Sequence, residues 1–239
     1  MVIRLLSSSI AAAALVAGLA VGLASGAPRQ SVTPHARAVV VPAQKLSARV
    51  ERPMGVPVFD RPGGRRLELL TMRTEWGSRR VMPVIAHEGP WLRVLADVPG
   101  RRSGWILAAG DDLSLHVQRY SLVARRSRGT LTLLDRGRPI RTVAAAFGRG
   151  DSPTPAGRFA VTDRLSGAGF GGAYGCCILA LSGHQPRLPP GWTGGDRLAI
   201  HATDRPVPRP SAGCIVATDA DLRYLMRRAP LGTPVTIRP

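Results

Sequence analysis

Cys214, directly preceded by Gly213, has surroundings in the sequence that favour covalent chemistry. His201 lies upstream at the end of an apolar run over residues 198–200, and twelve residues separate it from Cys214. A cysteine nucleophile acts as the thiolate, and a neighbouring imidazole can take its proton and stabilise the anion. We therefore predict His201 as the base for Cys214. For a Gly-Cys pair taken alone, the alternative is a buried, inert cysteine.

Gly213 is expected to give the predicted nucleophile a tight turn, since a residue without Cβ permits one. Such a turn would expose the sulfur and aim the amides of Gly213 and Cys214 at a developing oxyanion. Ser211 would add a hydrogen bond to the substrate or to the turn itself. The chemistry thus needs an apolar strand that delivers His201 and a proline-rich loop that returns the chain to Cys214.

The region that must supply these elements, residues 119–239, is predicted to be rich in β-structure. Short apolar runs predict strands over residues 131–134, 140–146, 159–161, 177–181, 198–200 and 235–237. The first two form a hairpin around a turn at residues 135–138. One helix is predicted after Thr218, which makes a capping pair with Asp221 ahead of the stripe Leu222, Leu225 and Met226.

Residues 46–115 are predicted to form a separate small all-β unit. Strands are expected over residues 56–59, 81–85, 91–95 and 105–107. A Trp-Leu-x-Val strand at Trp91, a basic turn and then Gly-Trp-Ile at Trp105 resemble bacterial SH3-type barrels. The alternative is that both tryptophans serve only as core aromatics. Residues 28–45 lack apolar periodicity and are interpreted as a linker.

The first 27 residues resemble an export signal. Residues 1–4 carry one positive charge, residues 5–24 are largely apolar, and residues 25–27 are small, as a signal peptidase requires. The alternative is an uncleaved membrane anchor, because the apolar stretch is long enough to span a bilayer. We therefore expect an exported protein of the cell wall or periplasmic space, with anchoring by this segment as the open alternative.

The chain is strongly basic, with a formal net charge of +18, and Lys45 is its only lysine. Such a charge favours nucleic acid or another anionic surface. Export argues against nucleic acid, so an anionic wall polymer or membrane surface is the expected partner. A general bias toward arginine in the composition is the alternative explanation.

Three cysteines, Cys176, Cys177 and Cys214, do not form the even, spaced set of a disulfide framework. Adjacent cysteines rarely bridge each other, so a reactive thiol is expected. A disulfide from one of the pair to Cys214 would switch an enzyme off, whereas a merely packed cysteine would do nothing. Together with His184 and His201 these residues could bind zinc, but their spacing matches no common zinc pattern. No metal and no other cofactor are predicted.

Several segments, in order along residues 119–239, resemble the YkuD-type L,D-transpeptidase catalytic domain, a family of peptidoglycan cross-linking enzymes. The family pattern has an apolar strand ending in Ile-His-Gly and, later, Ser-His-Gly-Cys. The matching segments here are Leu-Ala-Ile-His at 198–201, Ser-Ala-Gly-Cys-Ile at 211–215, Phe-Gly at 147–148, Pro-Thr-Pro-Ala-Gly-Arg-Phe at 153–159, Ala-Tyr-Gly at 173–175, Leu-Ala-Leu-Ser-Gly-His at 179–184, Asp-Ala-Asp-Leu at 219–222 and Leu-Gly-Thr-Pro-Val-Thr-Ile at 231–237.

The resemblance implies a mainly β fold: a small SH3-like barrel followed by a β-sandwich-like transpeptidase domain with one or two helices. It implies that the Cys214 thiolate attacks the carbonyl before the terminal D-Ala of a stem tetrapeptide and forms a thioester. An amine of a second stem would then give a 3→3 cross-link. His201 would act as base and then acid, oriented by the backbone carbonyl of Ala202 or Thr203. Carbapenems are expected to acylate Cys214.

Departures from the family pattern leave other functions open. Ala212 stands where a second His is usual, Val216 where Arg or Asn is usual, and Ala202 where Gly is usual. A wall-binding protein with a degenerate active site is one alternative. Hydrolysis of stem peptides, with water as acceptor, is another. Tyr174 would line the substrate cleft or belong to the core.

Overall fold

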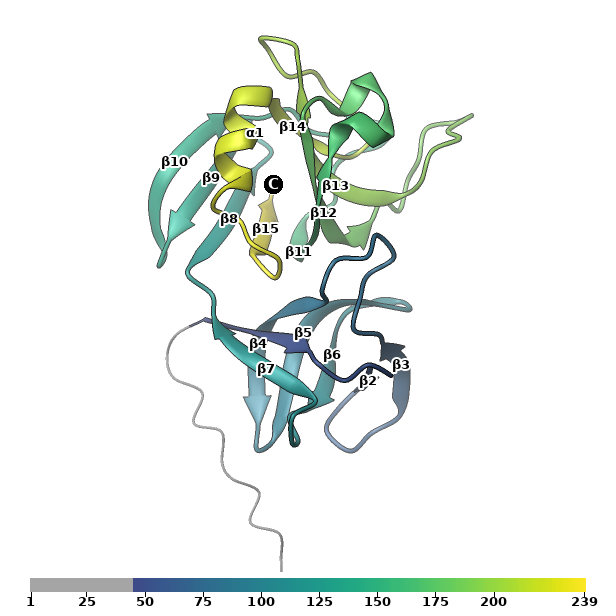
Figure 1. Ribbon diagram of the computed structural model, residues 1–239. Coiled ribbons are helices and arrows are strands. Elements are labelled where there is room, and N and C mark those ends of the chain that lie inside the picture. Colours follow the sequence, from purple (N-terminus) through teal and green to yellow (C-terminus); the bar gives the residue numbers. More distant parts are fainter. Residues whose placement is uncertain (1–44) are drawn as a thin grey trace, which may run out of the picture. The chain divides into compact units, whose positions relative to one another are not determined.

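The computed structural model describes residues 45–239 (Figure 1). The predicted export signal (1–27) and the predicted linker up to residue 44 lie outside the described residues. In the part that is described, no helix is both long enough and apolar enough to cross a membrane.

The first sheet has seven strands in the order β3-β2-β6-β5-β4-β1-β7. They are β1 (Leu46–Val50), β2 (Val56–Phe59), β3 (Arg66–Leu70), β4 (Val81–Glu88), β5 (Trp91–Val98), β6 (Arg101–Leu107) and β7 (Leu113–Val117). Alternate apolar side chains such as Val58, Leu92 and Val94 are fully buried and form its core. The all-β character predicted for residues 46–115 is confirmed, while the SH3-type resemblance stays a prediction.

The second sheet has eight strands in the order β10-β9-β8-β15-β11-β12-β13-β14. They are β8 (Tyr120–Arg125), β9 (Thr130–Asp135), β10 (Arg138–Ala144), β11 (Gly157–Ser166), β12 (Cys177–His184), β13 (Arg197–Thr203), β14 (Ile215–Thr218) and β15 (Pro234–Arg238). Phe159, Leu179 and Ile200 are fully buried in its core. Strand β13 pairs antiparallel with β12 and parallel with β14, so His201 on β13 and Cys214, directly before β14, are delivered by adjacent strands.

The helix α1 (Asp219–Met226) packs against β12, β13 and β14 (Figure 1). The Thr218 hydroxyl accepts a hydrogen bond from the Asp221 amide, which confirms the predicted cap. Leu222 and Leu225 are fully buried, as the apolar stripe predicts. Two short 3₁₀ turns, η1 (Gly167–Phe170) and η2 (Gly172–Tyr174), precede β12.

The mainly β fold predicted from the sequence is confirmed, with one α-helix among the described residues. Strand β13 does not end at His201 as predicted but continues to Thr203. The reason is the parallel partner: residues 200–203 pair in register with residues 215–218, which come much later in the chain. A local apolar pattern carries no information about such a partner.

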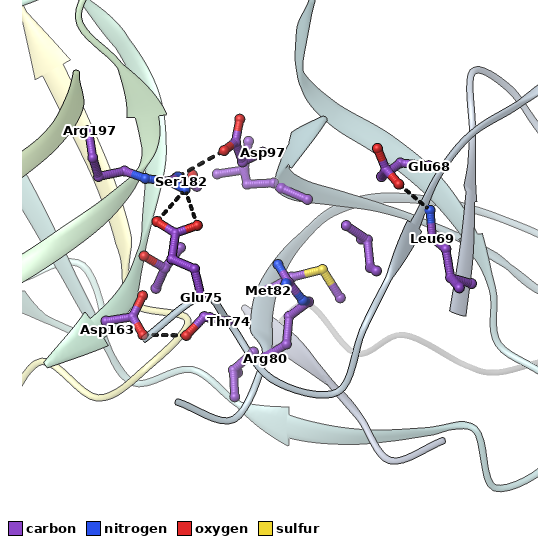
Figure 2. Close-up of a pocket in the computed structure, with 15 residues that line it drawn as sticks. Glu68, Leu69, Thr74, Glu75, Arg80, Met82, Asp97, Asp163, Ser182 and Arg197 are labelled. Atoms are coloured by element: carbon purple, nitrogen blue, oxygen red, sulfur yellow. Dashed lines mark hydrogen bonds and ion pairs between the residues drawn. The ribbon is translucent and has the colours of Figure 1, made fainter. Parts of the chain in front are cut away.

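Polar side chains connect the two sheets (Figure 2). Arg197, at the start of β13, binds both carboxylate oxygens of Glu75 at 2.9 Å and Asp97 at 2.9 Å. Thr74 donates to Asp163, which is fully buried. The strand that carries His201 is therefore attached at its first residue to the sheet of residues 46–117.

Candidate active site

His201 lies on β13 with a fixed ring orientation. Its Nδ1 is 2.9 Å from the backbone oxygen of Ala202. A carbonyl oxygen can only accept, so Nδ1 carries the hydrogen and donates it. In the neutral ring Nε2 then has a free lone pair and can accept a proton. Of the two carbonyls considered from the sequence, that of Ala202 orients the base.

Cys214 lies at the end of a turn that its own neighbours stabilise. The Ser211 hydroxyl donates to the Cys214 carbonyl at 2.7 Å and accepts from the Gly213 amide at 3.0 Å. Gly213 has a φ of +123°, a conformation that suits glycine. Of the two uses foreseen for Ser211, it therefore serves the turn.

The prediction that the amides of both Gly213 and Cys214 face an oxyanion is wrong for Gly213. Its N–H is already bound to the Ser211 hydroxyl. Within the described residues the Cys214 amide has no backbone acceptor, so it remains the candidate donor to an oxyanion. A glycine at this position permits the turn, but the donor direction depends on the whole hydrogen-bonded loop.

Three buried polar residues that the sequence analysis did not select brace this turn. The fully buried Ser152 hydroxyl lies 2.8 Å from the Ala212 carbonyl. The fully buried Thr154 hydroxyl accepts from the Gly148 amide at 2.8 Å and lies 3.5 Å from the Cys214 carbonyl. Buried Gln185 packs so closely that a Cβ on Gly213 would lie 2.0 Å from its Nε2. The segment 153–159 was singled out as a family match, but not for this contact.

Burial decides the charge state of the two candidate catalytic groups. It lowers the pKa of His201, and the hydrogen bond to Ala202 only partly offsets this effect. Burial also raises the pKa of the Cys214 thiol, against a hydrogen bond from the Ala199 backbone. At neutral pH the pair is therefore a thiol and a neutral imidazole. The nucleophile must form by proton transfer to His201 during the reaction.

Tyr174 completes the group around the thiol. Its ring centroid is 4.9 Å from that of His201 at an interplanar angle of 59°. Burial raises the pKa of Tyr174, and the nearby Cys214 thiolate adds to the shift. Tyr174, His201 and Cys214 thus lie together, and the hydroxyl of Tyr174 stays protonated as a hydrogen-bond donor.

These residues open onto a cavity of about 760 Å³, within the range of pockets for peptides and small ligands. The cavity is lined by the predicted Tyr174, His201, Ser211 and Cys214, and also by Gln185, Leu188, Trp192, Asp196, Arg197, Asp204, Arg205, Arg209, Ala212 and Val216. Ala202 and Gly213 lie behind its wall and act through their backbones. Sequence reasoning did not find Trp192 or the two loop arginines, because no local pattern marks them.

Comparison with known proteins assigns the segment that forms this cavity to a family. Residues 119–237 match the family model for the L,D-transpeptidase catalytic domain, YkuD. This segment is a YkuD-type L,D-transpeptidase catalytic domain. No curated protein matches the chain.

Solved structures similar to the chain include L,D-transpeptidases. The Bdellovibrio bacteriovorus protein Bd1075 is 23% identical over 51% of this chain and 48% of its own, with a TM-score of 0.42. L,D-transpeptidase 3 from Mycobacterium tuberculosis, in complex with a faropenem-derived adduct, is 16% identical over 57% and 73%, with a TM-score of 0.40. An L,D-transpeptidase from Mycobacterium smegmatis is 14% identical over 80% and 97%, with a TM-score of 0.39. The match spans about half the length of the Bdellovibrio protein.

Cys176 and Cys177 form a disulfide with each other, and Cys214 is free. The prediction that the adjacent pair would not bridge is wrong. Neighbouring side chains point to opposite faces in a strand, but Cys176 lies in the turn before β12, where that alternation does not hold. Because the pair is closed on itself, neither sulfur is bonded to Cys214.

His184 does not line this cavity and is bound to two carboxylates. Its Nε2 is 2.7 Å from Asp97 on β5, and its Nδ1 is 2.8 Å from Asp196. Burial acts to lower the pKa of His184, but the two carboxylates outweigh it and raise the pKa. Across the described residues no group of three or more His, Cys, Asp or Glu side chains is arranged to hold a metal ion.

Proposed function

We propose that this protein is a peptidoglycan L,D-transpeptidase that forms 3→3 cross-links through a thioester on Cys214. The observation that carries the proposal is His201, anchored through Nδ1 to Ala202, in the same cavity as the single free cysteine. Membership of residues 119–237 in the YkuD family gives this pair its reaction class.

The first half-reaction uses the groups as they lie in the cavity. Nε2 of His201 takes the proton from Sγ of Cys214, and the sulfur attacks the carbonyl carbon before the terminal D-Ala of a donor stem. The Cys214 amide donates to the resulting oxyanion. The C–N bond then breaks, His201 returns the proton to the leaving amine, and D-Ala departs from a thioester.

The second half-reaction regenerates the thiol. An amine from a neighbouring stem attacks the thioester, and His201 takes its proton. The C–S bond breaks and the proton passes to the sulfur, which leaves a new amide between two stems. With water as the nucleophile the same steps give hydrolysis, so an L,D-carboxypeptidase is the second candidate. Cys214 is only partly buried and lines the cavity, so water can reach its thioester, and this observation supports the second candidate.

Acylation by a carbapenem, read by intact mass, tests the nucleophile. The native protein is expected to gain one adduct, and a variant with Cys176→Ala and Cys177→Ala together is expected to gain it as well. Cys214→Ala is expected to gain none. Native protein without an adduct would favour a wall-binding protein with a degenerate site. Analysis of the products formed from tetrapeptide muropeptides then distinguishes the two reactions: cross-linking joins two stems, whereas hydrolysis gives a shortened stem.

The proposed place of action is the cell wall or periplasmic space, with the first 27 residues as an export signal or membrane anchor. The basic composition, +18 overall, supports an additional attraction to anionic wall polymers. Expression of the full chain with a C-terminal epitope, followed by fractionation, would show whether it leaves the cytoplasm and whether the segment is cleaved.

A further inference from the structure

Two arginines of the loop between β13 and β14, Arg205 and Arg209, line the cavity that holds Cys214. Both residues are exposed. Neither side chain makes a hydrogen bond or an ion pair with any residue that the structure describes. Two guanidinium groups are thus available to a ligand in this cavity.

The other charged residues of the cavity wall are largely neutralised by partners. Arg197 is held by Glu75 and Asp97, each at 2.9 Å. Asp196 is bound to His184 at 2.8 Å. Asp204 is then the one carboxylate of the wall that no described cation pairs with. Two free guanidiniums against one free carboxylate leave this part of the wall positive, which favours an anionic ligand group.

The part of the cavity lining formed by Val216 and His201 offers no cation. Val216 pairs in register with His201 and lines the cavity with an apolar side chain. Burial keeps His201 neutral. Among the described residues that line this cavity, the cations without an acidic partner are therefore those of Arg205 and Arg209.

We propose that Arg205 and Arg209 bind the free C-terminal carboxylate of the donor peptide, one residue beyond the attacked carbonyl. The proposal rests on the proposed function, since it names the donor of that reaction. One extended residue spans about 3.5 Å, so this carboxylate lies close to Cys214 when the carbonyl is in place. Guanidinium groups bind carboxylates through paired hydrogen bonds. The site thus selects donors with a free terminal acid over donors with a terminal amide.

Two small alkylating agents test the carboxylate site without any transpeptidase turnover. Iodoacetate and iodoacetamide both form a bond between the Cys214 sulfur and carbon as iodide leaves, but only iodoacetate carries a carboxylate. Their rate ratio at one fixed pH is measured by intact mass on the native protein, on Arg205→Gln with Arg209→Gln, and on Arg128→Gln with Arg138→Gln. The last pair is exposed, lies outside the cavity and removes the same charge.

The ratio of iodoacetate to iodoacetamide rates is expected to fall about fivefold in the loop variant and to stay within about twofold of native in the matched control. Added salt should lower the native ratio toward that of the loop variant. An equal ratio in the native protein and the loop variant would overturn the proposal. So would an equal fall in both double variants, because it would assign the effect to overall charge.

Donor peptides give the second measurement. A tetrapeptide stem with a free C-terminal acid is compared with its C-terminal amide, and the acyl-enzyme is followed by mass. The native protein is expected to prefer the acid by about tenfold, and the loop variant to lose this preference while it still reacts with the amide. If neither peptide acylates the native protein, the proposed function fails, and the alkylation ratio still decides the carboxylate site by itself. Equal acylation by acid and amide would contradict selection by the two arginines.

Discussion

Loss of hydration on burial sets the protonation states of Cys214 and His201 before the reaction. Burial favours the uncharged form of each group, so the thiol and the imidazole are both neutral at rest. The backbone oxygen of Ala202 fixes which ring nitrogen accepts the proton. This arrangement differs from a preformed thiolate–imidazolium pair, and the difference can be measured.

The alkylation rate of Cys214 by iodoacetamide is expected to rise with pH. Because the pKa of the thiol is raised, its thiolate fraction should keep increasing above about pH 8.5, the ordinary pKa of a cysteine. A stopped-time mass assay from pH 5 to 10 gives the profile, with a simple thiol as the reference. A rate that levels off below neutral pH would show a preformed thiolate instead.

Gly213→Ala is expected to destabilise the fold and abolish acylation. The new Cβ would lie 2.0 Å from Nε2 of Gln185, and the φ of +123° is strained for alanine. A cost of about 1–3 kcal/mol is typical of such strain. Thermal unfolding and carbapenem acylation measure both effects. Gly150→Ala, with open space around it, no positive φ and a position outside the cavity, is the matched control and should behave as native.

Among the elements, the nucleophile turn depends on a segment far from it in sequence. Residues 146–149 run beside residues 211–216, with the Ala146 amide bound to the Val216 carbonyl at 2.9 Å. Thr154 ties this segment to the turn from the buried side. The position of Cys214 is thus set by contacts from before β11 as much as by its own strand.

Thr154→Val removes the acceptor of the Gly148 amide but keeps the shape of the side chain. An unsatisfied buried amide costs about 1–3 kcal/mol, so a loss of stability of this order is expected. The rate of Cys214 acylation should fall with it, because the turn loses its brace. Chemical denaturation and acylation kinetics measure the two effects. Thr132→Val, on an exposed strand pair, should leave both unchanged; equal losses in the two variants would refute the role of Thr154.

For the molecule as a whole, the sheet of residues 46–117 is joined to the strand that carries His201. Asp97 accepts hydrogen bonds from both Arg197 and His184 (Figure 2 shows the arginine contact). Glu75 accepts hydrogen bonds from Nη2, the other terminal nitrogen of Arg197. This cluster makes the stability of the connection depend on the charge of His184.

The contribution of His184 to stability is expected to be largest at acidic pH. Its pKa is raised in the folded protein, so the stabilisation is complete below the ordinary histidine pKa of about 6.5 and is lost as the pH rises through the raised value. The free energy of unfolding of the native protein, measured in urea, should therefore be lower at pH 8.5 than at pH 6, because the contribution of His184 is lost. His184→Gln should remove that part of the difference, whereas His87→Gln should preserve it. An unchanged difference in His184→Gln would contradict the assignment.

The sequence by itself determined the features that depend on local order. Short apolar runs predicted ten of the strands but not β1, β3, β7, β8 and β14, Thr218 with Asp221 predicted the helix cap, and the Gly213-Cys214 pair with an upstream His201 indicated the candidate chemistry. The ordered segments across residues 119–239 gave the family, which the match over residues 119–237 confirms. Each of these features depends only on neighbouring residues or on their spacing.

Only the tertiary structure decided the features that join distant segments. The disulfide of Cys176 with Cys177 follows from a turn that interrupts strand alternation. The use of the Gly213 amide by Ser211, and the cavity wall with Arg205 and Arg209, depend on how loops fold back over β13. The protonation states of Cys214 and His201 depend on burial, a property of the packed molecule that composition and spacing do not contain.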